Sequence, residues 1–180
     1  MFTVEENKKL IEKYPFLLPR NVWTDKVDDE YDYSYIRGIG EIPDGWNNLF
    51  LQMCEDLRRQ LLKEGRLETF RFTQIKEKYN RMECYNNGCS ASAHRIIDKY
   101  SNIAGYICTV CGKPAVLETN GYILSFCAEC YDKHFSHIKA EPIIFVPKYR
   151  IIRYENGKKI YHTFSFQREW NRYLKKLNTK

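Results

Sequence analysis

Apolar side chains recur at helical spacing in four stretches of the chain. The clearest helix covers residues 43–65, where apolar positions fall three or four apart and Gly65 marks the end. The same spacing predicts helices over residues 4–14, 89–105 and 165–180. The apolar side of the clearest helix consists of Trp46, Leu49, Phe50, Met53, Leu57 and Leu61.

Two further segments show the period-two alternation of strands. Residues 70–86 predict a strand, a short helical turn at residues 74–80 and a second strand. Residues 148–163 predict a hairpin around Asn156-Gly157, because this dipeptide tolerates the positive φ angles that a two-residue hairpin turn requires. In the register that this turn sets, the facing pairs are Glu155 with Lys158, Ile152 with Tyr161, and Arg150 with Thr163.

The composition is that of a globular chain with a polarised charge. Hydrophobic residues make up 43% and charged residues 29%, and no apolar run approaches the ~18 residues that a membrane span needs. Acidic residues near the N-terminus argue against a signal peptide, so we expect a cytoplasmic protein with no membrane partner. The net charge of +6 conceals a gradient, from −4 over residues 1–60 to +8 over residues 131–180.

Four of the seven cysteines form two Cys-x-x-Cys pairs, Cys108 with Cys111 and Cys127 with Cys130. Disulfides are rare in a reducing compartment, and two such pairs separated by fifteen residues have the spacing of a zinc site. A hairpin predicted over residues 115–124 would return the second pair to the first. Four thiolates complete a tetrahedral shell, so the sequence predicts a structural zinc ion. A redox-active pair and an iron–sulfur cluster are alternatives that the spacing favours less.

A knuckle, a hairpin and a ligand-bearing helix in this order resemble the treble-clef class of zinc fingers. The predicted fold class is therefore α+β, with small antiparallel sheets packed with helices around an embedded four-cysteine finger. We expect one compact domain with three regions. These are a largely helical region at residues 1–104, the zinc-binding module at residues 105–140, and a basic hairpin with a C-terminal helix at residues 141–180.

The remaining cysteines are weaker candidates for chemistry. Cys54 lies beside an apolar stripe and is expected to be a small buried hydrophobe. Cys84, Cys89 and His94 could bind a second metal only with a fourth ligand from another segment, and free thiols are the simpler interpretation.

No catalytic motif accompanies these residues. The sequence lacks the paired motifs of zinc deaminases, the HExxH of metalloproteases, a phosphate-binding glycine loop and the GxSxG of hydrolases. A treble-clef nuclease would need a histidine just before the ligand helix, where residues 124–126 are Leu, Ser and Phe. We therefore predict a protein without enzymatic activity.

Two charged surfaces are candidates for binding a macromolecule. Basic side chains of the predicted hairpin and last helix could neutralise phosphates, and Tyr149, Tyr154 and Tyr161 could stack on bases. The basic residues are Lys148, Arg150, Arg153, Lys158, Lys159, Arg168, Arg172, Lys175 and Lys176. The candidate acidic surface consists of Asp25, Asp28, Asp29, Glu30 and Asp32. A solvated charge run is the alternative for both.

Three blocks of sequence follow one another in a recognisable order. Gly45-Trp46 opens a helix, a Lys-Glu-Lys-aromatic motif at residues 76–79 follows a strand, and a Cys-x-x-Cys-Gly site at residues 108–112 comes last. This order, over about residues 41–131, resembles a group of uncharacterised phage and prophage proteins. The chain departs from that group at Asn80, where the group has glycine. The resemblance implies a phage or mobile-element origin and no mechanism.

Two functions are consistent with these features. A small phage-encoded protein without catalytic residues is expected to bind a host protein or ribonucleoprotein complex, as an anti-defence inhibitor of the anti-CRISPR kind does. The alternative is an accessory or regulatory protein that binds DNA or RNA through the basic hairpin and C-terminal helix. Such binding would weaken steeply with salt, because each phosphate contact releases counterions.

Overall fold

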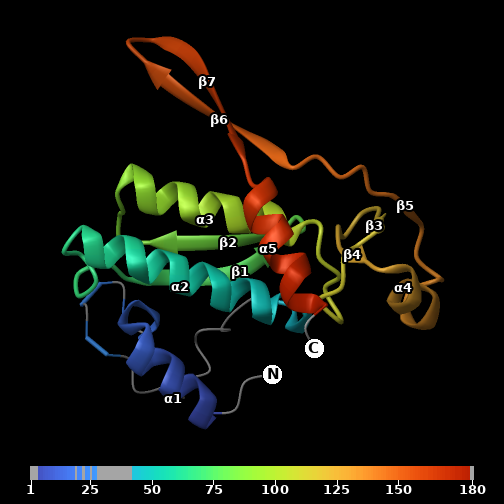
Figure 1. The fold of residues 1–180 in the computed structure, drawn as a ribbon, viewed down its shortest axis with the longest axis horizontal. Helices are drawn as coiled ribbons and strands as arrows, with labels where there is room; N and C mark the ends of the chain where they lie inside the picture. The colour runs from blue at the N-terminus through green and yellow to red at the C-terminus, as the bar shows by residue number, and fades with distance from the viewer. Residues whose placement is uncertain (1–3, 19, 22, 25, 28–41, 179–180) are drawn as a thin grey trace.

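The computed structural model describes residues 4–18, 20–21, 23–24, 26–27 and 42–178 of the chain (Figure 1). Within them the fold is α+β, which confirms the predicted class. The helices are α1 (Val4–Lys13), η1 (Pro15–Leu17), η3 (Asp44–Trp46), α2 (Asn47–Lys63), α3 (Ala91–Ala104), α4 (Ala128–His134) and α5 (Gln167–Leu177). The strands are β1 (Phe72–Lys78), β2 (Arg81–Asn86), β3 (Leu117–Thr119), β4 (Ser125–Phe126), β5 (Ala140–Pro142), β6 (Lys148–Glu155) and β7 (Lys158–Ser165).

The strands form three small antiparallel sheets. The β1–β2 hairpin packs against α2 and α3 in the body of the protein, and β4-β3-β5 forms a three-stranded sheet beside α4 (Figure 1). The third sheet is the β6–β7 hairpin, here called the arm (residues 148–165), which projects away from the helices in Figure 1. All three facing pairs predicted for the arm are confirmed, and Asn156 and Gly157 have φ angles of 51° and 75°.

One apolar core joins segments from both ends of the chain. Phe16 of η1, Trp46 before α2, Phe70 before β1 and Phe166 before α5 are all fully buried. Every predicted apolar position of α2 is also fully buried. Burying one such side chain contributes roughly 1.5–3 kcal/mol. The basic C-terminal region therefore shares its core with the N-terminal region, while the cysteine module has a smaller cluster of its own.

The predicted helical turn at residues 74–80 is wrong. Strand β1 continues to Lys78, and the chain reverses at Tyr79 and Asn80, whose φ angles are 52° and 59°. Positive φ at both central residues is the geometry of a two-residue hairpin turn. The turn escaped prediction because it holds no glycine and because Ile75 is the only buried apolar residue in the middle of the strand.

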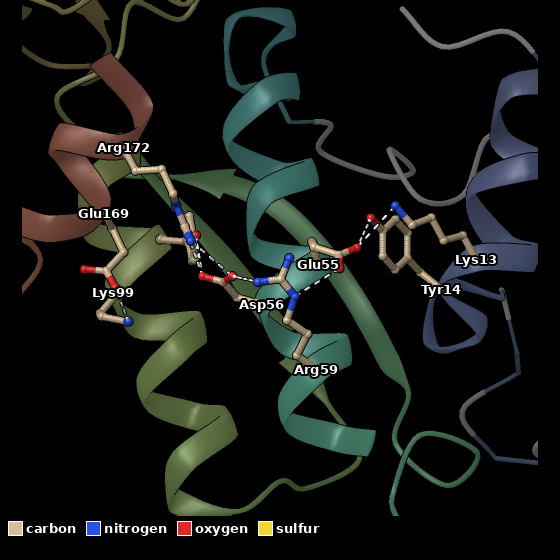
Figure 2. A network of polar contacts seen from close by, with 9 residues as sticks. Lys13, Tyr14, Glu55, Asp56, Arg59, Lys99, Glu169 and Arg172 are labelled. Carbon is tan, nitrogen blue, oxygen red and sulfur yellow. Dashed lines mark hydrogen bonds and ion pairs between the residues drawn. The ribbon is translucent and has the colours of Figure 1, made fainter. Parts of the chain in front are cut away.

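Ion pairs and hydrogen bonds attach α5 to α2 and α3 (Figure 2). Arg172 Nη2 lies 2.6 Å from Asp56 Oδ2, and the Tyr100 hydroxyl donates to the same carboxylate at 2.8 Å. Lys99 pairs with Glu169 at 2.8 Å. Burial alone would raise the pKa of Asp56, but the hydrogen bonds from Arg172 and Tyr100 lower that pKa below its ordinary value.

No helix within the described parts of the chain is long and apolar enough to cross a bilayer.

Candidate metal centre

The sulfur atoms of Cys108, Cys111, Cys127 and Cys130 converge on one point. All four lie within 4.8 Å of one another, and the Sγ atoms of Cys111 and Cys127 are 3.6 Å apart. A tetrahedral zinc ion with Zn–S bonds of about 2.3 Å requires sulfur–sulfur distances of about 3.8 Å. The four residues therefore fit a single metal ion, as the spacing of the two pairs predicts.

Two local structures bring the pairs together. The first pair lies in a tight turn, where the Gly112 N–H donates to Cys108 O at 3.0 Å and Gly112 has a φ of 76°. The β3–β4 pairing, with Leu117 opposite Phe126, returns the chain to that turn. Cys127 is then the N-cap of α4, and Cys130 lies in its first turn. This order of turn, hairpin and helix is the predicted one.

The thiols of the metal-free protein differ in acidity. Burial raises the pKa of Cys108, but hydrogen bonds from the backbone of Cys111 and Cys127 outweigh burial and lower that pKa below its ordinary value. Burial raises the pKa of Cys111 and of Cys130. Because a metal binds thiolate, loading the site must release protons from Cys111 and Cys130.

The Gly45-Trp46 pair docks directly on the first turn of the metal centre. The Gly45 N–H donates to Thr109 O at 2.9 Å, and Trp46 Nε1 donates to Ile107 O at 3.2 Å. A Cβ atom on Gly45 would lie 2.0 Å from Cys108 O, so the close approach requires glycine. The helix start and the metal centre are thus one packed unit.

Two more residues hold the metal module from other directions. The Tyr173 hydroxyl of α5 donates to Gly112 O. Asn80, in the β1–β2 turn, is 3% exposed and donates through Nδ2 to Ser125 Oγ at 2.5 Å and to Glu118 Oε2 at 3.0 Å. Sequence reasoning missed the contacts of Tyr173 and Asn80 with this module. The one local signal for Asn80 was that asparagine tolerates the left-handed backbone that this residue adopts.

The other cysteines take no part in this centre. Cys54 is fully buried, as predicted. Cys89 Sγ lies 3.9 Å from His94 Nδ1, but within the described residues only the four-cysteine cluster gathers three or more metal-binding groups. Burial raises the pKa of the Cys89 thiol, so its surroundings favour the unreactive protonated form.

The predicted basic surface is divided between the arm and α5. Lys148, Arg150, Lys158 and Lys159 are exposed on the arm, and Arg153 lies opposite Ile160 in the strand register. On α5, the residues Arg168, Lys175 and Lys176 are exposed, whereas Arg172 is held in its ion pair with Asp56.

The predicted stacking role of Tyr149 is wrong. Its side chain is 8% exposed and stacks on Phe166 at the base of the arm, and its hydroxyl donates to Arg95 O at 3.3 Å. The side chain of Tyr154 lies outside the described residues, as do Asp25, Asp28, Asp29, Glu30 and Asp32 of the candidate acidic surface.

The fold and the site together define an α+β protein with a four-cysteine cluster that could hold one metal ion. Comparison with protein-family models, with curated proteins and with solved structures finds no match to this chain. The likeness to phage and prophage proteins therefore stays a prediction from the three sequence blocks.

Proposed function

We propose that this chain is a non-enzymatic, zinc-stabilised protein that binds nucleic acid through the exposed face of its arm. The observation that carries this proposal is the cluster of basic side chains around one exposed tyrosine on that face. Lys148, Arg150 and Lys159 are exposed on the same face of the arm as Tyr161, which is 52% exposed. Arg150 Cζ and Lys159 Nζ lie 5.4 Å and 5.6 Å from the centroid of the Tyr161 ring.

The alternation of the strands separates this exposed face from a half-buried one. Along β7 the residues Lys159, Tyr161 and Thr163 are exposed, and Ile160, His162 and Phe164 between them are half-buried. A base stacked on Tyr161 would contribute ~1–3 kcal/mol, and its flanking phosphates would meet the neighbouring cations. Together the ring and the cations suit a flexible single strand, whose bases are free to stack.

Zinc is the metal that the donor set favours. Four thiolates in a tetrahedral arrangement suit zinc, and they leave no open position for water or substrate. The binding free energy of such modules, roughly 10–16 kcal/mol, contributes to folding. In this chain that energy stabilises the platform formed by Gly45-Trp46, the first turn of the centre and Tyr173.

A fluorescence anisotropy titration tests the proposal with labelled single- and double-stranded DNA and RNA. The variant Lys148→Ala/Arg150→Ala/Lys159→Ala is compared with wild type, and Lys9→Ala/Lys63→Ala/Lys133→Ala is the control because it removes the same charge elsewhere. If the three arm cations each contact one phosphate, raising salt from about 50 to 200 mM weakens wild-type binding to a single strand about 18-fold. The arm variant should lose the affinity that these three phosphate contacts supply, and the control variant should keep it.

Two results would refute the assignment. One is that no nucleic acid binds near physiological salt. The other is that the control variant loses as much affinity as the arm variant, which would make the attraction a matter of net charge alone.

A second candidate function is binding to a host protein or ribonucleoprotein complex by a phage-encoded, anti-defence protein. Exposed apolar side chains favour it: Ile144 is 83% exposed, Val116 49% and Val146 48%. Exposed apolar residues that gather in a patch are typical of protein-binding surfaces. The candidate loses its support if tagged protein retains no stoichiometric partner from a host lysate.

A further inference from the structure

The Lys-Glu-Lys-aromatic motif at residues 76–79 forms the end of β1 and the first residue of the turn to β2. Residues that lie directly opposite one another, such as Lys78 and Arg81, share one face of this hairpin, and alternate residues point to the other face. The face that carries Ile75 is buried against the body. The opposite face, here called the hairpin face, carries Gln74, Lys76, Lys78, Arg81, Glu83 and Tyr85.

The two lysines of the hairpin face take no part in ion pairs among the described residues. Each lies instead beside a tyrosine ring. Lys76 Nζ is 5.2 Å from the centroid of the Tyr85 ring, and Lys78 Nζ is 5.5 Å from that of Tyr79. The arm places cations beside the exposed ring of Tyr161 in the same way. The hairpin face therefore combines free positive charge with aromatic rings, as sites for single-stranded nucleic acid do.

Tyr79 is held on the surface in a conformation that costs the fold free energy. Its φ of 52° is left-handed, which disfavours any residue with a Cβ atom. Its side chain is 72% exposed, so packing returns little of that cost. Strained backbone of this kind is concentrated at functional sites. An exposed ring in a strained turn therefore points to a ligand for the ring.

We infer that the hairpin face and Tyr79 form a second surface for single-stranded nucleic acid. The inference rests on the proposed function, because the ligand is the one proposed for the arm. A base stacks on the ring of Tyr79, and the phosphates beside that base lie against Lys76 and Lys78.

A protein partner suits this face less well. The centre of a protein–protein interface is depleted in lysine and glutamate. The hairpin face has no aliphatic side chain, and Lys76 and Lys78 are consecutive on it. Phosphates, in contrast, gain affinity from each unpaired lysine that they contact.

The carboxylates on the hairpin leave the charge of this face positive. Glu83 lies 3.6 Å from Arg81, so these two charges offset each other. Glu77 belongs to the other face, where it accepts hydrogen bonds from the Asn80 N–H at 2.7 Å and from the Tyr122 hydroxyl at 3.0 Å. The two unpaired lysines therefore set the sign of the charge.

A hollow of about 430 Å³ beside Tyr79 is acidic. Glu118 and Glu141 line it and lie opposite each other on β3 and β5. Arg81, which also lines the hollow, is already paired with Glu83. The two carboxylates would repel phosphates, so a strand stacked on Tyr79 runs along the lysines and not into the hollow.

Fluorescence anisotropy with a labelled single strand tests the inference on zinc-loaded protein. In Lys76→Ala/Lys78→Ala two phosphate contacts are lost, so the weakening that salt causes between about 50 and 200 mM should be about sevenfold smaller than in wild type. Lys9→Ala/Lys63→Ala is the matched control, because it removes the same charge from exposed positions on α1 and α2. Its salt response should equal that of wild type.

Substitutions of Tyr79 test the stacking. Tyr79→Ala should bind at least about fivefold more weakly, whereas Tyr79→Phe, which keeps the ring, should bind as wild type does. Tyr122→Ala is the control, because its ring is 73% exposed and lies off the hairpin face, and its affinity should not change. Tyr79→Gly should lose as much affinity as Tyr79→Ala and melt no lower than wild type, because glycine adopts the left-handed backbone without strain.

The inference is overturned if Lys76→Ala/Lys78→Ala keeps the wild-type salt response, or if Tyr79→Ala binds as tightly as wild type. A melting temperature of Tyr79→Gly below that of wild type would also overturn it, since the ring would then serve the fold. If only the arm variant loses affinity, the inference fails and the proposed function stands. If only the hairpin variants lose affinity, the assignment to the arm fails and the inference stands. If no nucleic acid binds and Lys76→Ala/Lys78→Ala releases a host protein that wild type retains, both are refuted.

Discussion

Gly45→Ala is the sharpest test of whether the start of α2 and the metal centre form one cooperative unit. The added Cβ would lie 2.0 Å from Cys108 O and 2.8 Å from Gly112 N. Both neighbours are backbone atoms in the turn that carries the first pair of cysteines, so no side chain can rotate away. Either the helix start must withdraw or the metal-binding turn must deform.

The cost can be worked out from the contacts that would separate. Withdrawal breaks the hydrogen bonds from Gly45 N–H to Thr109 O and from Trp46 Nε1 to Ile107 O, each of about 1 kcal/mol. Overpacking in a close-packed interior adds about 1–3 kcal/mol. The expected loss of about 3–5 kcal/mol is a large part of the roughly 5–15 kcal/mol that stabilises a typical domain.

Urea unfolding of the zinc-loaded protein, followed by tryptophan fluorescence, measures this loss, and competition with a chromogenic chelator measures metal affinity. Gly65→Ala is the control at the other end of the same helix. Gly65 has a φ of 65°, and an added Cβ there would meet no atom of the described residues within 4 Å, so only the left-handed backbone costs free energy, about 1 kcal/mol. The reasoning fails if Gly45→Ala loses no more stability than Gly65→Ala and binds metal equally well.

Three further predictions concern acid and metal. Because the pKa of Asp56 is lowered in the folded state, its contribution to stability is present above the unfolded pKa of about 4 and disappears as pH falls through the folded pKa. Asp56→Asn should therefore destabilise by about 2 kcal/mol at pH 7 and lose much less at pH 2, as urea titrations at the two pH values would show. Chelation should release one metal ion per chain and lower the melting temperature by more than about 10 °C, since the site contributes folding free energy. Metal affinity should also fall on acidification, because protons compete with the metal for Cys111 and Cys130. Competition with a chelator at a series of pH values measures this affinity, and an affinity that does not change with pH would contradict the prediction.

Features that depend on neighbouring residues were predictable from the sequence. The four cysteines needed only their spacing, and the register of the arm needed only Asn156-Gly157. The start of α3 also follows from a nearby residue, because the side chain of Ser90 accepts a hydrogen bond from the Ala93 N–H. In each case the physical cause lies within a few residues: ligand geometry, positive φ, or a capping side chain.

Features that depend on the meeting of distant segments were decided by the tertiary structure alone. Trp46 bonds to a carbonyl 61 positions away, and Arg172 pairs with a carboxylate 116 positions away. Nothing near Arg172 in the sequence distinguishes it from the basic residues that stay exposed, and nothing near Gln52 reveals that it lines a cavity with residues of α1 and α5. Local chemistry is carried by adjacent residues, whereas the partner of a buried polar group is set by which surfaces the chain brings together, and that is a property of the whole fold.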